Sequence, residues 1–139
     1  MNILFEGENI KSVEEYREIW KNQGDTMIEK IEHYSQMKFA SQEIKAFVYN
    51  GKSTSHPLML RDSYSYNFKK AVLIHELLHI LFVDNNLKFK DSLSLHKKLY
   101  FFYKDILLDL YGKEFLDYII EEESKWGEIY KKSWESILH

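Results

Sequence analysis

The sequence of 139 residues contains no cysteine and only one proline. Without cysteine the chain cannot form a disulfide, and any metal ion would have to be held by histidine and carboxylate side chains. The chain also lacks a block of basic residues, and its formal net charge at pH 7 is −3. Nucleic-acid binding proteins usually carry a basic stripe, so we expect no nucleic-acid partner.

Long hydrophobic runs are also missing. The longest apolar stretch, residues 71–83, contains three ionisable side chains and is too short to span a bilayer. Residues 1–6 have neither the basic start nor the long apolar core of a signal peptide. The sequence therefore predicts a protein without a membrane partner and with a cytoplasmic location.

The residues that are present indicate a globular chain, since 45% of them are hydrophobic and 16% are aromatic. A length of 139 residues suits a single domain spanning residues 1–139. We expect an α+β fold that is mostly helical, with a small sheet of two to three strands. The predicted segments are N-terminal helices over 12–38, the sheet over 44–61, and helices over 68–83, 92–111 and 114–137.

Local sequence patterns support the predicted N-terminal helices and the predicted sheet. Ser12 and Glu15 have the spacing of a capping box, which predicts that a helix opens at residue 12. Residues 22–25 are expected to interrupt or kink that helix. The stretch 44–49 is typical of a strand, and Pro57 at the start of 57–61 suits an edge strand because proline has no N–H to donate.

The motif that organises the chain lies in the apolar stretch 72–82, where His75, Glu76 and His79 are the only ionisable residues. Two histidines four residues apart lie on the same face of a helix, so both imidazoles can reach one zinc ion. Glu76 would stand beside the metal, where a general base can take a proton from water. The pattern therefore predicts a metal site, against the alternative of core histidines satisfied by neighbouring polar groups.

The third ligand can be sought by helical phase. Advancing 100° per residue through the predicted helix 114–137 places Glu123 in the centre of its apolar stripe, Glu122 at the edge and Glu121 on the opposite side. A buried carboxylate needs a positive or hydrogen-bonding partner, so Glu123 is the first candidate. Glu122 is the second, and Asp117, Glu114 and His96 remain open. A lysine, an arginine or a buried hydroxyl could partner Glu123 instead.

Several other metal motifs are excluded. A metzincin would need glycine at position 82 and histidine at position 85, where this chain has Phe82 and Asn85. Peptide deformylases use a cysteine ligand, which is absent. A carboxylate-bridged di-iron bundle would need a second E-x-x-H motif besides residues 76–79.

With His75, Glu76, His79 and Glu123, the chain resembles the gluzincins, and by its size the minimal members called minigluzincins. The resemblance implies a zincin-like fold and a zinc metallopeptidase in which Glu76 is the general base. It also implies that an extended peptide or protein substrate pairs with the edge strand of the sheet, expected at 58–61. The chain departs from the family after Ile120, where no N-E-x-x-x-D or E-G-x-A form occurs.

A non-catalytic alternative is a latent or metal-binding domain that acts as an interaction module. A fourth protein ligand in place of water would favour it, and His139 could supply such a ligand. For the catalytic alternative, the donors that could stabilise the oxyanion are Tyr118, Tyr130, His96 and Arg61.

Overall fold

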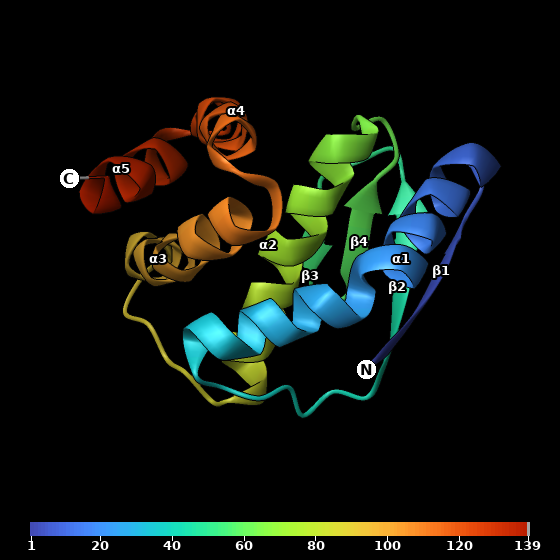
Figure 1. Ribbon diagram of the computed structural model, residues 1–139, viewed down its shortest axis with the longest axis horizontal. Helices are drawn as coiled ribbons and strands as arrows, with labels where there is room; N and C mark the ends of the chain where they lie inside the picture. The colour runs from blue at the N-terminus through green and yellow to red at the C-terminus, as the bar shows by residue number, and fades with distance from the viewer. Residues whose placement is uncertain (139) are drawn as a thin grey trace. The chain divides into compact units, whose positions relative to one another are not determined.

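The computed structural model describes residues 1–138 and divides into two compact units, residues 1–86 and residues 87–139. Unit 1 contains β1 (Asn2–Gly7), α1 (Ile10–Ser35), β2 (Glu43–Tyr49), β3 (Thr54–Ser55), β4 (Leu58–Arg61) and α2 (Tyr66–Asp84), and unit 2 contains α3 (Ser92–Tyr111), α4 (Lys113–Ser124) and α5 (Glu128–Ile137) (Figure 1). The predicted α+β, mostly helical fold is confirmed. A single domain over 1–139 stays a prediction, because compact units need not be independent domains.

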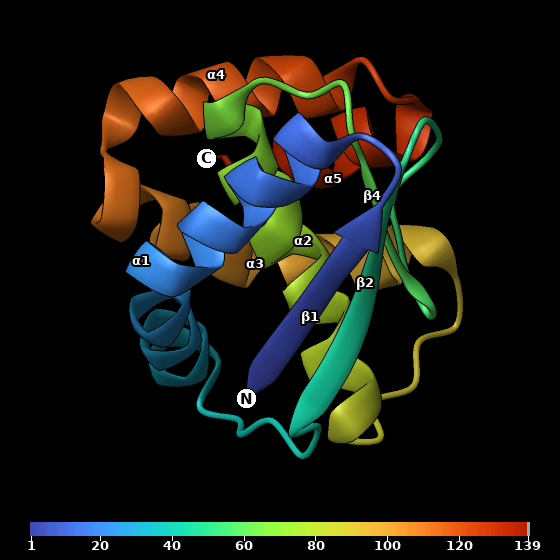
Figure 2. The same ribbon diagram turned by 90° about the vertical axis from the view of Figure 1, so that its right-hand side faces the viewer.

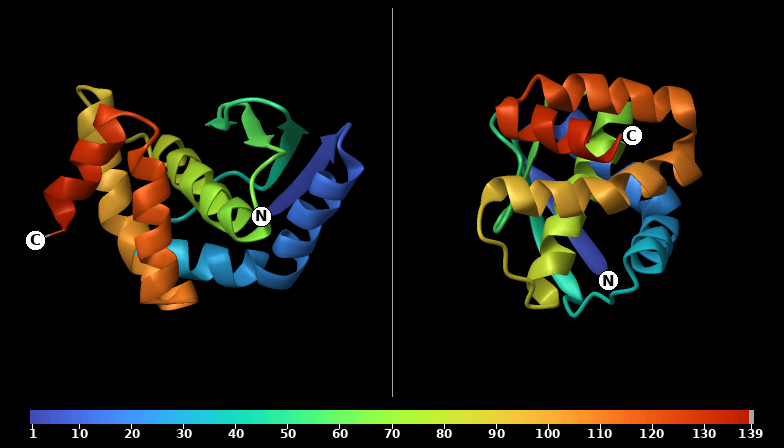
Figure 3. Two further views of the ribbon diagram at one scale, coloured as in Figure 1. Left: turned by 90° about the horizontal axis from the view of Figure 1, so that it is seen from above. Right: turned by 90° about the vertical axis from the view of Figure 1, so that its left-hand side faces the viewer.

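Unit 1 is built on a four-stranded sheet with the order β1-β2-β4-β3. β1 and β4 both pair with β2 in parallel, and Figure 2 shows β1 and β2 running side by side. Alternate residues of the strands are buried on one face (Ile3, Phe5, Ala46, Val48, Leu58 and Leu60), and α1 and α2 lie on that side of the sheet (Figure 3). The sheet thereby provides an apolar floor for α2.

The predicted edge strand at 58–61 is wrong along part of its length. The two-residue strand β3 pairs with β4 in antiparallel fashion, Thr54 opposite Met59 and Ser55 opposite Leu58. β4 therefore lies between β2 and β3, and the sheet has one strand more than expected. The polar residues 52–56 carry no alternating hydrophobic pattern, so this short strand could not be predicted from periodicity.

The helix α1 differs from its prediction at the start, and it is not interrupted in the middle. It begins at Ile10 because Asn9 is the N-cap, and the Asn9 side chain accepts a hydrogen bond from the N–H of Ser12. Ser12 is therefore not the cap, and its hydroxyl instead donates to the carbonyl of Asp62. The helix also continues through residues 22–25, where the missing side chain of Gly24 leaves room for the ring of Trp20.

The described part of unit 2, residues 87–138, contains three helices, and the last predicted helix is in fact two. α3 has the predicted bounds 92–111, whereas the segment 114–137 is divided into α4 and α5 by residues 125–127. Gly127 has φ +152°, a conformation that glycine adopts far more easily than other residues, and it precedes the first turn of α5. Helical phase cannot be carried across this break, and Trp126, which lies in it, is 39% exposed.

Among the described residues, no helix is both long enough and apolar enough to cross a membrane. The expected cytoplasmic location stays a prediction.

Candidate metal centre

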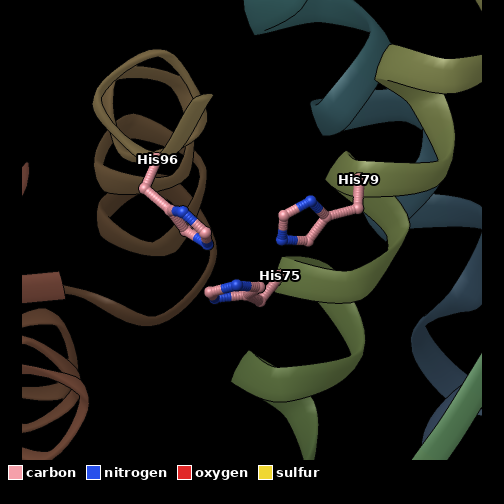
Figure 4. A group of neighbouring side chains, drawn as sticks. All are labelled: His75, His79 and His96. Atoms are coloured by element: carbon pink, nitrogen blue, oxygen red, sulfur yellow. The ribbon is translucent and has the colours of Figure 1, made fainter. Parts of the chain in front are cut away.

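The helix α2 presents His75 and His79 on the same side, one turn apart (Figure 4). Their ring centres lie 5.1 Å apart and their ring planes are inclined by 40°. Zinc–nitrogen bonds of about 2.0–2.1 Å in tetrahedral geometry would place the centres of two coordinating imidazoles about 5 Å apart. The pair therefore has the separation that a shared metal ion requires.

The surroundings of this pair are apolar, as predicted. His75 is 2% exposed and Glu76 is 7% exposed, and His79 is partly exposed. The other residues from Ala71 to Phe82 are buried. Burying the charge of a carboxylate among aliphatic side chains is costly, and a nearby cation would lower this cost. The burial of Glu76 beside the two imidazoles therefore fits a metal site.

The N-terminal end of α2 is anchored to α1 by a buried lysine that sequence reasoning missed. Lys69 is 2% exposed, and its Nζ donates to Oε1 of Glu15 at 3.1 Å and to the carbonyl of Tyr64 at 2.8 Å. The hydroxyl of the N-cap Ser65 accepts a hydrogen bond from the N–H of Phe68. Lys69 is followed by Lys70, which is partly exposed, so residue type alone does not show which of the two lysines is buried and needs such partners.

The C-terminal end of α2 is anchored by Asp84. Its Oδ2 accepts hydrogen bonds from the N–H groups of Ala40 at 2.9 Å and Ser41 at 2.8 Å, and its Oδ1 accepts one from the Ser41 hydroxyl at 2.9 Å. Asn85 adds a bond from its side-chain amide to the carbonyl of Lys38. Both ends of the helix that carries the two histidines are thus fixed within unit 1.

We expect Asp84→Ala to lower the free energy of unfolding by about 2–3 kcal/mol, because three charge-assisted hydrogen bonds are lost. Urea denaturation followed by circular dichroism measures this change. The matched control is Asp25→Ala, at an exposed position of α1, which should stay within about 0.5 kcal/mol of the wild type. Equal stability of the two variants would contradict the anchoring role of Asp84.

In unit 2, the helix α3 carries His96, which is 6% exposed. Its Nδ1 lies 2.9 Å from the carbonyl oxygen of Ser92, one turn earlier. The Ser92 hydroxyl oxygen also lies 3.2 Å from Nδ1. A carbonyl oxygen can only accept a hydrogen bond, so the neutral tautomer that fits this contact has its proton on Nδ1 and leaves the Nε2 lone pair for a metal. Metal-binding histidines are commonly oriented in this way by a backbone carbonyl.

Within residues 1–138, the three histidines His75, His79 and His96 form a group that could hold a metal ion. Figure 4 shows that the first two project from α2 and the third from α3. His96 was one of the open candidates for the third ligand, behind Glu123 and Glu122. His33, by contrast, is exposed on α1, and His139 lies outside the described residues.

The predicted burial of Glu123 is confirmed, since this residue in the last turn of α4 is 0% exposed. Its Oε1 accepts a hydrogen bond from the Tyr100 hydroxyl at 2.8 Å, and its Oε2 accepts one from the Tyr103 hydroxyl at 2.6 Å. Burial, and next the nearby Glu123 carboxylate, raises the pKa of Tyr100, so its hydroxyl stays protonated and able to donate. Buried hydroxyls were one of the partners considered for Glu123, and its role as a metal ligand stays a prediction.

The second carboxylate candidate has a different environment. Glu122 is partly exposed, and its Oε1 lies 3.1 Å from Nζ of Lys125. This pair sits on the surface of α4, where an ion pair contributes little to stability. Among the described residues, the possible metal-binding group consists of His75, His79 and His96 and includes neither Glu122 nor Glu123.

Comparisons with protein-family models, with curated proteins and with solved structures found no match to this chain. The group of three histidines by itself makes this chain a candidate metal-binding protein with histidine ligands.

Proposed function

We propose that this protein is a zinc-dependent peptidase in which His75, His79 and His96 hold the metal ion and Glu76 is the general base. The observation that carries the proposal is the pair of imidazoles on α2, spaced for one metal ion, with the buried Glu76 next to the first of them. His75, Glu76 and His79 all lie on α2, which is anchored at both ends within unit 1. His96 contributes the third nitrogen from α3.

The donor set suits this chemistry. Imidazole nitrogens bind zinc well, although nickel or another divalent ion can also occupy such a site. Three protein ligands leave one coordination position open, which is the arrangement of catalytic rather than structural zinc sites. A bound zinc ion would polarise a substrate carbonyl and lower the pKa of water.

The role of Glu76 follows from its place in the helix. It comes directly after His75, so its carboxylate is carried beside the metal ligands rather than among them. There it would accept a proton from the attacking water and return it to the leaving amine of the peptide. Glu76 would thus serve first as a base and then as an acid.

An extended peptide or protein is the partner that we propose for this site. Pairing with a sheet edge would hold such a chain by main-chain hydrogen bonds. Along Leu58 and Met59 this edge is taken by β3, so the substrate would have to pair elsewhere, for example with β3 itself.

Removal of metal tests the proposal as a whole. The purified protein should bind one zinc ion per chain, cleave members of a mixed peptide library, and lose cleavage on dialysis against a chelator, with recovery when zinc is added back. Zinc at 100 times its Kd should also stabilise the fold by about 2.7 kcal/mol, which corresponds to a rise in Tm of roughly 9 °C. Zinc binding without cleavage of any peptide would support the latent or non-catalytic alternative, and absence of zinc binding would contradict both.

A further inference from the structure

We propose that Glu123 is a positioning residue that orients His96 through Tyr100, and is not itself a metal ligand. This inference rests on the proposed metal site, because it assigns Glu123 its effect through one of the three histidines. All the contacts that carry it lie within unit 2.

The first step runs from α4 to α3. Oε1 of Glu123 accepts a hydrogen bond of 2.8 Å from the hydroxyl of Tyr100, and both residues are buried. The ring of Trp134 in α5 also stacks on the ring of Tyr100, with the ring centres 4.0 Å apart and the ring planes inclined by 21°. The position of the Tyr100 ring is therefore fixed both at its hydroxyl and at its face.

The second step runs along α3 from Tyr100 to His96, one helical turn earlier. The two rings meet in an edge-to-face arrangement, with centres 6.0 Å apart and planes inclined by 70°. Tyr130 of α5 makes a closer contact of the same kind with His96, at 4.8 Å and 68°. With Nδ1 also bonded to the carbonyl of Ser92, the imidazole of His96 is held on its ring and at one nitrogen. Its Nε2 is thereby aimed before any metal binds.

Both carboxylate oxygens of Glu123 accept hydrogen bonds, which is what fixes the orientation of a positioning residue. Each of them accepts a hydroxyl, one from Tyr100 and one from Tyr103, at 2.8 and 2.6 Å. A carboxylate held by two such donors is oriented toward them. Residues that orient a metal-binding histidine commonly change metal affinity by 10–100-fold when mutated. Because Glu123 acts through one intervening ring, we expect the lower end of this range.

The test measures zinc affinity of the full-length protein by competition with a chromophoric chelator. Glu123→Gln and Tyr100→Phe should each weaken zinc binding about tenfold, and the double variant should be weaker than either by less than about twofold, since both break the same connection. In a His96→Ala background, Glu123→Gln should no longer change the affinity by more than about twofold. Glu121→Gln, at an exposed position of the same helix, is the matched control and should match the wild type.

The alternatives give different results. If Glu123 were a ligand, Glu123→Gln would weaken zinc binding strongly even in the His96→Ala background, and Tyr100→Phe would have little effect. If Glu123 served only the stability of unit 2, the variants would unfold at lower urea concentration but bind zinc as the wild type does. If Glu123→Gln does not fold, Tyr100→Phe is used in its place, with Co²⁺ bound instead of zinc. A visible spectrum of Co²⁺ that differs from that of the wild type supports the positioning role, and an unchanged spectrum contradicts it. Wild-type protein that binds no zinc would overturn the proposed function as well, whereas zinc binding without this coupling overturns the positioning role alone.

Discussion

Replacing Glu76 by glutamine is expected to lower kcat for peptide cleavage by about 10²–10⁴-fold while zinc remains bound, because general acid–base catalysis contributes about this factor. Glutamine has nearly the shape of glutamate and keeps hydrogen-bonding atoms in the buried position, so the fold should be preserved. It cannot accept a proton at neutral pH, and the step assigned to Glu76 is lost.

Steady-state kinetics on a cleaved peptide, together with zinc content, measure both parts of this prediction. Glu29→Gln, at an exposed position of α1, makes the same chemical change away from the histidines and should leave kcat unchanged. Zinc-dependent cleavage at the wild-type rate by Glu76→Gln would remove Glu76 from the mechanism, although the metal site could stand.

The second large effect concerns the ligands. Replacing either His75 or His79 by alanine is expected to weaken zinc binding by about 10²–10³-fold, since about 10–16 kcal/mol for a four-ligand zinc site corresponds to about 2.5–4 kcal/mol per ligand. His96→Ala should weaken it to a similar extent if His96 is the third ligand. The histidine on α1, His33, is exposed, and His33→Ala should bind zinc as the wild type does.

Loss of a buried ring also costs packing energy, so zinc affinity must be separated from stability. His75 is 2% exposed, and truncating it to alanine leaves a cavity on the apolar side of α2. Unfolding in the presence of chelator gives this cost without metal, and the zinc affinity then refers to the folded fraction. Full zinc affinity in a folded His79→Ala variant, which removes the partly exposed ligand, would contradict a shared metal ion on α2.

The part of the site that lies on α2 could be predicted because it depends on local geometry alone. His75, Glu76 and His79 fall within a little over one turn, and the apolar residues around them indicate a buried helix, which the structure confirms. A spacing of four residues fixes the relation of two side chains once the helix exists. No information about distant parts of the chain was needed.

The third ligand depends on tertiary structure, and here the sequence was a poorer guide. Helical phase correctly placed Glu123 in the interior, but interior position alone does not distinguish a ligand from a residue held by Tyr100 and Tyr103. The feature that favours His96, the bond from its Nδ1 to the carbonyl of Ser92, leaves no trace in hydrophobic periodicity.

The errors at the start of α1 and before α5 have the same origin, because sequence patterns do not determine which local conformation the chain adopts there. Asn9 and Ser12 are both good N-caps, and the helix begins at the first of them while Ser12 bonds to Asp62. The break before α5 depends on the backbone conformation of Gly127, which hydrophobic periodicity does not reveal.

The most direct test of the metal site is anomalous diffraction from crystals grown with zinc, measured on both sides of the zinc absorption edge. We expect one strong peak per chain, bonded to ring nitrogens of His75 and His79 and to Nε2 of His96, with Glu76 beside it and outside the set of ligands. A crystal grown with zinc that shows no peak at the two histidines of α2 would contradict a metal site on this helix.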